Sequence, residues 1–352
     1  MSEYRTQLEE AVRAIVIHSA TSYSWMSDRS PRLPRKVQRA LTPVTARAYL
    51  RYSLQTQLYH SFYRLGLPAP IDGEQPKRSL EGRTPFVDAL SAANHGQGFI
   101  DEGWTVRQIL DTTVVVEKHG LELWVPVDQC LAPAGTRIAV GESVGLPHPS
   151  ALPAYSPGFY AVFGDRPFPA SSAVPIVRLY WHLTSEGAVP FVQVASELLN
   201  RARISFRFKV LSDPERYERC DAAVIYVPAD NYQDAAPIIE QIYAHVAPGL
   251  RAATPAFTKP LAPGLGLAED PPGGQSFGMH RCGLVADGLI AAHSEGAAAL
   301  GERVGHVVDR FAEAGIDIDA PYLNPGSTDV YDNEFLLEAA RRPAEAALPN
   351  RG

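Results

Sequence analysis

The chain has 352 residues, of which 45% are hydrophobic and 20% charged, and its formal net charge is −7. This length exceeds the usual size of one hydrophobic core, so we expect two domains, or one domain with a substantial N-terminal elaboration. The acidic balance argues against generic nucleic-acid binding, and the sequence contains neither a signal-peptide pattern nor a run of 18 apolar residues that would indicate a membrane protein.

The cysteines and histidines point to no metal site and no disulfide framework. Cys130, Cys220 and Cys282 are widely spaced and form no C-x-x-C pair, which favours a reducing, cytoplasmic compartment. Several scattered histidines have no partner at metal-ligand spacing, and core or surface roles are expected for them: His18, His60, His95 and His245.

Two helices are predicted near the N-terminus, over residues 3–19 and 43–66. The second has an aromatic and aliphatic stripe at roughly helical spacing, for which a core role is favoured: Tyr52, Leu58, Tyr59, Phe62 and Tyr63. Between the helices lies a basic run that is broken by two prolines: Arg29, Arg32, Arg35, Lys36 and Arg39. A solvated loop is the simplest interpretation of this run, and docking of an acidic peptide or partner protein is the alternative.

The remaining elements alternate between strand and helix patterns. Residues 85–150 look β-rich, and strands are predicted at 174–183, 203–211 and 222–228. Helices are predicted at 188–200, 231–247 and 297–314, and a Pro/Gly-rich connection of thirty residues occupies 254–283. The sequence therefore predicts an α+β fold, in which a helical and β-rich N-terminal part precedes an α+β domain with long ordered loops.

Two predicted strands place polar side chains on one face. In "SFRFKVL", residues 205–211, a period of two puts Arg207 and Lys209 opposite a row of apolar residues. In "IVRLYWHL", Arg178, Tyr180 and His182 share a face in the same way. An ordinary half-solvated strand is the simplest interpretation of each pattern. If both strands lie in one sheet with these faces on the same side, the polar residues meet in one cleft.

More polar residues that could join this cleft follow along the chain: Arg216, Arg219, Tyr226, Ser276, His280 and Arg281. Several guanidinium groups beside a lysine suggest a doubly charged oxyanion, above all phosphate, although a surface ion pair is the usual role of a single arginine. Gly274, Ser276 and Gly278 form a G-x-S-x-G pattern, but the preceding "AEDPPGG" does not suit the strand that a nucleophile elbow requires. The sequence lacks a G-x-x-x-x-G-K-[ST] loop, so phosphoryl transfer from ATP is not expected.

Four segments together resemble the HopA-type effector family over roughly residues 50–330: "VRLYWHL", "FRFKVLSDPERYERCDAAVIYV", "PAFTKPLAPGLGLAEDP" and "SFGMHRC". The resemblance implies a lyase subunit for class V lanthipeptides and thioviridamide-like peptides. A partner kinase similar to aminoglycoside phosphotransferases would phosphorylate Ser or Thr of a precursor peptide, and the lyase would eliminate phosphate to leave dehydroalanine or dehydrobutyrine. This reaction requires neither metal nor organic cofactor. The implied division is an N-terminal region at 1–165, a phosphothreonine-lyase-like catalytic domain at 166–332 and a tail at 333–352.

The family is also distantly similar to phosphothreonine lyases, in which a strand motif Lys-x-His precedes the catalytic lysine by some thirty residues. Here Arg178-x-Tyr180 occupies the motif and Lys209 lies 31 residues after Arg178, so the spacing fits while the residue types differ. Abstraction of a weakly acidic α-proton needs a base whose pKa is depressed, as desolvation and nearby cations do for a lysine.

The resemblance thus implies Lys209 as the base and Tyr180, or His182 as second choice, as the acid. The implied phosphate ligands are Arg178, Arg216, Arg219 and Arg281, with supporting roles for Tyr226, His280 and Arg207. The alternative is a non-catalytic phosphopeptide-binding or effector-like subunit that supports a partner kinase.

Overall fold

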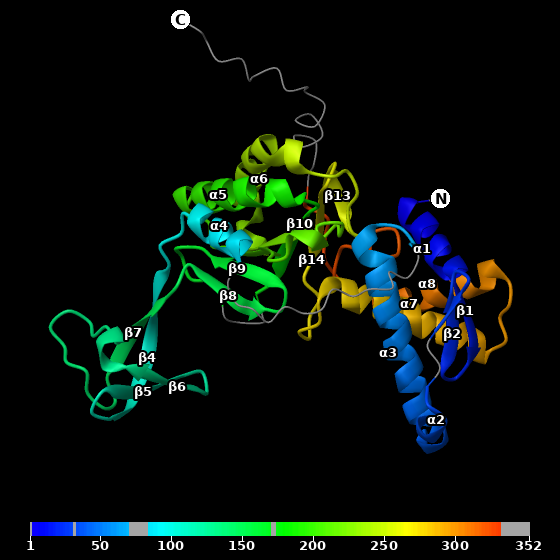
Figure 1. The fold of residues 1–352 in the computed structure, drawn as a ribbon, viewed down its shortest axis with the longest axis horizontal. Coiled ribbons are helices and arrows are strands. Elements are labelled where there is room, and N and C mark those ends of the chain that lie inside the picture. The colour runs from blue at the N-terminus through cyan, green and yellow to red at the C-terminus, as the bar shows by residue number, and fades with distance from the viewer. Residues whose placement is uncertain (1, 31–32, 70–83, 170–173, 332–352) are drawn as a thin grey trace, which may run out of the picture.

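A seven-stranded antiparallel sheet forms the centre of the computed structural model, which describes residues 2–30, 33–69, 84–169 and 174–331 (Figure 1). Its strand order is β13-β14-β10-β12-β11-β9-β8, and neighbouring strands pair antiparallel throughout. The strand bounds are β8 (Ala151–Ser156), β9 (Phe159–Phe163), β10 (Ile176–Trp181), β11 (Arg207–Leu211), β12 (Ala223–Pro228), β13 (Lys259–Ala262) and β14 (Leu265–Glu269).

Helices cover both faces of this sheet. One face packs against α4 (Pro85–Ala93), α5 (Ser185–Arg201) and α6 (Tyr232–Val246) in the larger hydrophobic core. The other face packs against α1 (Glu3–Ala14), α3 (Pro43–Ser61), α7 (Phe277–Ser294) and α8 (Leu300–Glu313) in a second core. The alternating side chains of each strand therefore divide between two separate cores.

Three smaller parts surround this body. A three-stranded sheet contains β1 (Ile15–Ser19), β2 (Ser22–Trp25) and β3 (Asp28–Arg29), and a short helix α2 (Arg35–Ala40) precedes α3. A four-stranded sheet projects from the body at the lower left of Figure 1, with a small core of its own. It consists of β4 (Phe99–Ile109), β5 (Thr113–Lys118), β6 (Leu121–Pro126) and β7 (Ser143–His148).

Short 3₁₀ helices occur as connectors: η1 (Tyr63–Leu65), η2 (Val127–Gln129), η3 (Pro214–Arg216), η4 (Ala229–Asn231) and η5 (Ala247–Gly249). None of the helices within the described ranges combines the length and apolar character that spanning a bilayer requires. All three cysteines are buried with free thiols.

The predicted α+β fold is confirmed, but several elements differ from their prediction. The first helix ends at Ala14, because the β-branched run that follows forms β1. The connection predicted over 254–283 is wrong: it contains the hairpin of β13 and β14 and the start of α7. Part of the basic run forms α2 instead of a solvated loop.

The proposed domain boundary at residue 165 stays a prediction. β8 and β9, which precede that boundary, are strands of the central sheet. The predicted tail, residues 333–352, lies outside the described residues.

Candidate functional site

The register of the central sheet arranges the polar side chains in two neighbouring rows. Residues paired across neighbouring strands point to the same face of a sheet. The first row, from β9 to β14, consists of Phe163, Arg207, Tyr226, Arg178 and Ala268. The second row consists of Ala161, Lys209, Val224, Tyr180 and Gly266. Both rows lie on the sheet face that packs against α3 and α7.

The second row explains why a hollow exists between the polar groups. Lys209 on β11 and Tyr180 on β10 are separated by one strand, where Val224 occupies the position between them. Ala161 and Gly266 lie at the ends of the row. Because these intervening side chains are small, the long side chains of Lys209 and Tyr180 border open space above the sheet.

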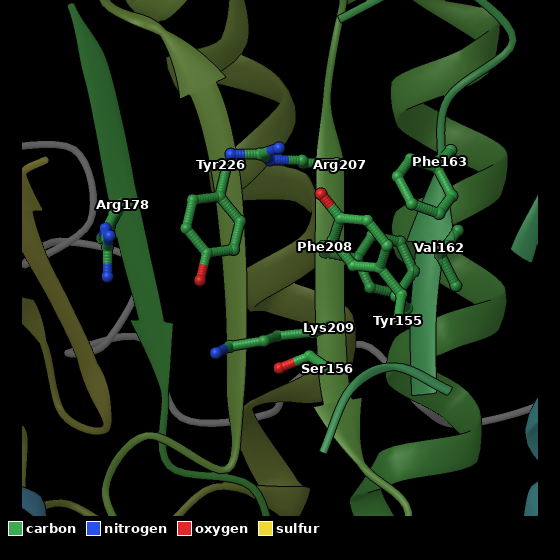
Figure 2. A pocket seen from close by; sticks show the side chains of 10 residues that line it. Tyr155, Ser156, Val162, Phe163, Arg178, Arg207, Phe208, Lys209 and Tyr226 are labelled. Atoms are coloured by element: carbon green, nitrogen blue, oxygen red, sulfur yellow. The ribbon is translucent and has the colours of Figure 1, made fainter. Parts of the chain in front are cut away.

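Two connected cavities occupy this space. The outer hollow has a volume of about 140 Å³ and is lined by Tyr155, Ser156, Ala161, Val162, Phe163, Arg178, Arg207, Phe208, Lys209 and Tyr226 (Figure 2). The inner recess has a volume of about 20 Å³ and is lined by Tyr59, Tyr63, Arg178, Tyr180, Lys209, Asp221, Val224, Tyr226, Ser276 and Gly278. Arg178, Lys209 and Tyr226 border both, so the two cavities are neighbours and are described together as one site.

Cationic groups dominate the outer hollow. The Tyr226 ring lies between the guanidinium groups of Arg178 and Arg207, each 5.2 Å from its centroid. The Lys209 Nζ lies 4.2 Å from the centroid of Phe159, and in Figure 2 its amine points along the sheet toward the strand of Tyr226. Arg178 pairs with Asp270, whereas no carboxylate of the described residues forms an ion pair with Arg207 or Lys209. The hollow is therefore positively charged and suits an anion.

A buried ion pair borders the inner recess. Arg219 donates Nε and Nη2 to the two carboxylate oxygens of Asp221, both at 2.6 Å, and the Tyr59 hydroxyl lies 3.3 Å from the same carboxylate. Burial alone would raise the pKa of Asp221, but Arg219, with a contribution from Lys209, holds it below the ordinary value. Asp221 is therefore ionised at neutral pH, and it compensates the charge of Arg219.

Three buried donors around the recess make no hydrogen bond of normal geometry within the described residues, namely the Tyr180 hydroxyl, the Tyr63 hydroxyl and Nε of Arg178, although Tyr63 and Arg178 lie close enough to Tyr180 to interact with its hydroxyl. Burial raises the pKa of Tyr180 to about 12, against the opposing effect of Arg178, and burial also raises the pKa of Tyr63. Both phenols are thus protonated at neutral pH. A buried donor without an acceptor costs about 1–3 kcal/mol, and a ligand that supplies acceptor oxygens would remove this cost.

The N-terminus of α7 adds backbone donors to the recess. Ser276 caps the helix by accepting a hydrogen bond from Met279 N, and Ser276 and Gly278 line the recess. The first amide groups of a helix have no partner within the helix and favour anions. Gly278 is required here, because a Cβ atom at this position would lie 2.2 Å from Cε1 of Tyr63.

Two of the residues assigned to the site on sequence grounds lie outside both cavities and hold a neighbouring loop. Arg281 is fully buried and donates Nε to Pro321 O at 2.7 Å and Nη2 to Leu323 O at 2.8 Å. Its Nη1 lies 2.8 Å from Nδ1 of His280. Burial lowers the pKa of Arg281 to about 10. Both side chains are thus engaged in structural contacts.

His182 and Arg216 also lie outside the cavities. His182 follows the end of β10, and its Nδ1 lies 3.0 Å from Ala253 O, while burial lowers its pKa. Arg216 ends η3 and is half-buried beside Gly158. The structure therefore brings together Lys209, Arg178, Tyr180, Tyr226 and Arg207, and the chemical roles assigned to them stay predictions.

Three polar residues of the recess were not assigned to the site from the sequence: Tyr59, Tyr63 and Asp221. The core role favoured for the aromatic stripe holds for Leu58 and Phe62, which are fully buried, but Tyr52 is 65% exposed. Tyr59, Tyr63 and Asp221 reach the recess through long-range packing and have no local sequence signal, whereas Ser276, named from the sequence, does line the recess. Within the described residues, no group of three or more His, Cys, Asp or Glu side chains could hold a metal ion.

A family model and two solved structures are similar to this chain. The structure of the effector protein from Pseudomonas syringae pv. tomato strain DC3000 is 19% identical, with a TM-score of 0.39, and the match covers 47% of this chain and 62% of that one. The structure of the effector protein from Pseudomonas syringae pv. syringae strain 61 is 14% identical, with a TM-score of 0.45, and the match covers 92% and 98%. No curated protein matches the chain. Residues 150–323, which contain both polar rows, match the model described as the HopA1 effector protein family.

Proposed function

We propose that this chain is a lyase that eliminates phosphate from phosphoserine or phosphothreonine in a ribosomally made precursor peptide. The main support is that Lys209 and the unpartnered Tyr180 hydroxyl border one recess, with Arg178 beside both. A base, an acid and a phosphate ligand are the three groups that such an elimination needs. The similarity of residues 150–323 to the HopA1 effector protein family is consistent with this proposal.

In the proposed complex, the phosphate group lies in the outer hollow at the entrance of the inner recess, because the recess itself has room for little more than one water molecule. Its oxygens would accept hydrogen bonds from Nε of Arg178, from the hydroxyls of Tyr63 and Tyr180, and from the first amide groups of α7. These donors are the buried groups that have no acceptor among the described residues, together with a helix N-terminus. The peptide chain would lie in the outer hollow, over the cationic face of the sheet.

The proposed reaction is a β-elimination. The unprotonated amine of Lys209 takes the α-proton of the phosphorylated residue, and the electron pair of that bond forms the Cα=Cβ double bond. The Cβ–O bond breaks, and Tyr180 donates its proton to the departing phosphate oxygen. The products are dehydroalanine or dehydrobutyrine and inorganic phosphate. Asp221, whose charge interacts with Lys209, stabilises the ammonium group that proton transfer creates.

Tyr180 is a better candidate for the acid than His182. Its hydroxyl borders the recess and makes no hydrogen bond of normal geometry within the described residues, and its pKa, raised to about 12, keeps it protonated at neutral pH. The His182 ring lies beyond the end of β10, against a backbone carbonyl. Arg178 is the remaining candidate for the phosphate ligand, because it lines both cavities and its Nε makes no hydrogen bond of normal geometry, although its Nη2 pairs with Asp270. The other three arginines line neither cavity: Arg216, Arg219 and Arg281.

The proposed partners are a precursor peptide and a kinase similar to aminoglycoside phosphotransferases, which would supply the phosphorylated peptide in the cytoplasm. The proposed reaction needs no metal or organic cofactor, because the acid, the base and the phosphate ligands are side chains. A non-catalytic phosphopeptide-binding subunit is the second candidate. It is supported by the same unpartnered donors, which would bind phosphate whether or not elimination follows.

Two variants of Lys209 separate these candidates. The native protein, incubated with a phosphorylated peptide, should yield a product that has lost the elements of phosphoric acid, measured by mass spectrometry. Lys209→Arg keeps a cation in the hollow but cannot act as a base, because an arginine stays protonated. Lys209→Met removes both properties. We expect both variants to lose turnover, whereas Lys209→Arg should keep its phosphopeptide affinity within a few-fold.

Undiminished turnover in both variants would refute the assignment of Lys209 as base. If the native protein binds the phosphorylated peptide but eliminates no phosphate from it, the second candidate, a non-catalytic binding subunit, is favoured.

A further inference from the structure

We propose that the basic segment, defined as α2 and the N-terminal half of α3, docks an acidic stretch of the peptide substrate outside the residues that react. This inference rests on the proposed function, since it names a second point of contact with the same substrate. The observations that support it are the charge of the segment, its exposure, and its connection through α3 to the inner recess.

The charge of the basic segment is opposite to that of the rest of the chain. Residues 35–52, which span α2 and the first ten residues of α3, contain five arginines and lysines and no acid, which gives a net charge of +5. The whole chain has a net charge of −7, so the remaining residues carry −12. A cationic surface on an otherwise anionic protein attracts anionic partners to that one place and repels them elsewhere.

The cations of α2 are available to a partner. All six residues of α2 are exposed, including Arg35, Lys36 and Arg39. No acidic side chain of the described residues forms an ion pair with these three, whereas Arg51, farther along α3, pairs with Asp287. The free charges therefore concentrate at the outer end of the segment, which Figure 1 shows beyond the body of the protein.

Exposed apolar side chains accompany these cations. Val37 on α2 is 43% exposed, and Val44 and Tyr52 on α3 are 78% and 65% exposed. A six-residue helix with no buried side chain is marginal in water, because nucleation is costly and packing supplies most helical stability. A peptide that covers Val37 and Val44 would bury this surface and stabilise α2 at the same time.

The occupant that fits this surface is an acidic peptide and not a lipid bilayer. Helices that lie on membranes have a broad apolar face beside their basic one. α2 has a single large apolar side chain, Val37, among its six residues. Isolated apolar residues between cations match a peptide in which acidic residues alternate with a few apolar ones.

α3 joins the basic segment to the reaction site. The helix has 19 residues and is therefore about 28 Å long at 1.5 Å per residue. Thr42 caps the outer end, next to α2, and Tyr59 at the other end lines the inner recess. An extended peptide needs about eight or nine residues to cover this distance. We therefore infer that the acidic stretch and the phosphorylated residue are separated by at least about this many residues.

A binding experiment with unphosphorylated peptides tests the docking site without any elimination. The probe is a fluorescent peptide in which Glu and Asp alternate with Leu, and its comparison is the same peptide with Gln and Asn in place of the acids. The variant combines Arg35→Glu, Lys36→Glu and Arg39→Glu. A matched control reverses three exposed cations elsewhere that form no ion pair within the described residues, Arg13, Arg137 and Arg251, and so has the same net charge.

We expect the native protein and the control to bind the acidic peptide, more weakly at high salt, and the α2 variant to bind it at least about tenfold less tightly. Affinity of the α2 variant equal to that of the control would overturn the proposal. Absence of binding to the acidic peptide would also overturn it, and if phosphatidylserine vesicles bound instead, the surface would be a membrane site.

A kinetic experiment tests the connection to the reaction. The substrates are phosphopeptides with the acidic stretch attached through spacers of different lengths, and a phosphopeptide without it. We expect KM to fall once the spacer reaches about nine residues and the α2 variant to raise KM of these substrates alone, with kcat unchanged. A KM independent of spacer length would contradict the docking site. Absence of turnover with every substrate would instead count against the proposed function, and the binding experiment would remain decisive for docking.

Discussion

Removal of the Tyr180 hydroxyl should stabilise the protein while it impairs the reaction. The hydroxyl is buried, in a side chain that is 3% exposed, and it makes no hydrogen bond of normal geometry within the described residues, although Tyr63 and Arg178 lie close to it. Because its pKa is raised to about 12, Tyr180→Phe changes no charge at neutral pH. The desolvation cost of about 1–3 kcal/mol disappears with the hydroxyl, so we expect a gain of about 1 kcal/mol in the free energy of unfolding.

Tyr217 provides a matched control, since it also has a buried hydroxyl. Its side chain is 2% exposed and lies in the core on the opposite face of the sheet. Its hydroxyl donates to Leu211 O at 2.6 Å. Tyr217→Phe should therefore lower the free energy of unfolding by about 1 kcal/mol, because the carbonyl loses its donor. The two variants remove the same atom but should change the free energy of unfolding in opposite directions, so that their stabilities differ by about 2 kcal/mol.

Urea unfolding without phosphate measures both changes, provided that the m-value stays constant. If Tyr180 is the acid, Tyr180→Phe should also lower kcat by about 100-fold or more, while Tyr217→Phe leaves kcat unchanged. Destabilisation of Tyr180→Phe to the same extent as Tyr217→Phe would show that the hydroxyl already has a partner. That result would refute the reasoning that it awaits a ligand.

Three further predictions concern the surroundings of the site. Gly278→Ala should destabilise the protein by about 1–3 kcal/mol and weaken phosphate binding, because the new Cβ would lie 2.2 Å from the ring of Tyr63. The control Gly301→Ala has open space around the new Cβ and should be neutral or stabilising. Equal urea midpoints for the two variants would contradict this prediction. Arg281→Lys should lower the unfolding temperature, because the carbonyls of Pro321 and Leu323 lose donors. The Kd for a phosphopeptide, measured by calorimetry, should not change. A large increase in Kd would show that Arg281 does contribute to phosphate binding. Burial lowers the pKa values of His60 and His280 to about 4, so these groups bind protons more tightly in the unfolded chain than in the folded protein. The free energy of unfolding should therefore fall as the pH decreases from about 6.5 toward 4. A double variant with Gln at both positions should show a weaker pH dependence of the urea midpoint.

The polar face of the sheet could be predicted because strand periodicity is a local property. A period of two puts Arg207 and Lys209 on one face of their strand, and Arg178 and Tyr180 on one face of theirs. Antiparallel pairing of both strands with β12 places the two pairs on the same face of the sheet. The pairing partner itself was not visible in the sequence. The common location of these residues was thus a hypothesis that needed the topology of the sheet.

α7 could not be predicted from periodicity. Most of its residues are buried, including Gly283, Gly288 and Ala291, so the helix lacks the polar face that gives an amphipathic pattern. Its glycines allow close approach of other elements: a Cβ at Gly288 would lie 2.5 Å from Cα of Val307 on α8. The same residues that permit this packing made the segment look like a loop.

The partners of the arginines could not be inferred from residue type. Arg219 and Arg281 carry the guanidinium groups that a phosphate site requires. In the structure, however, Arg219 pairs with Asp221, and Arg281 donates to backbone carbonyls. Conversely, Tyr63 resembled a core residue and borders the recess. Long-range contacts decide such roles, and the sequence contains no local record of them.

The alternation of side chains in β10, β11 and β12 has a consequence for how this protein can diverge. Odd and even positions of one strand serve different purposes: Phe208 and Val210 contribute to the core beneath the sheet, whereas Arg207 and Lys209 line the outer hollow on the other face. Mutations can therefore change the buried positions and the cavity-lining positions of these strands independently. Substitutions in the buried set should change how much folded protein a cell accumulates, and substitutions in the facing set should change what the surviving molecules recognise, so that new specificities can arise on an unaltered scaffold.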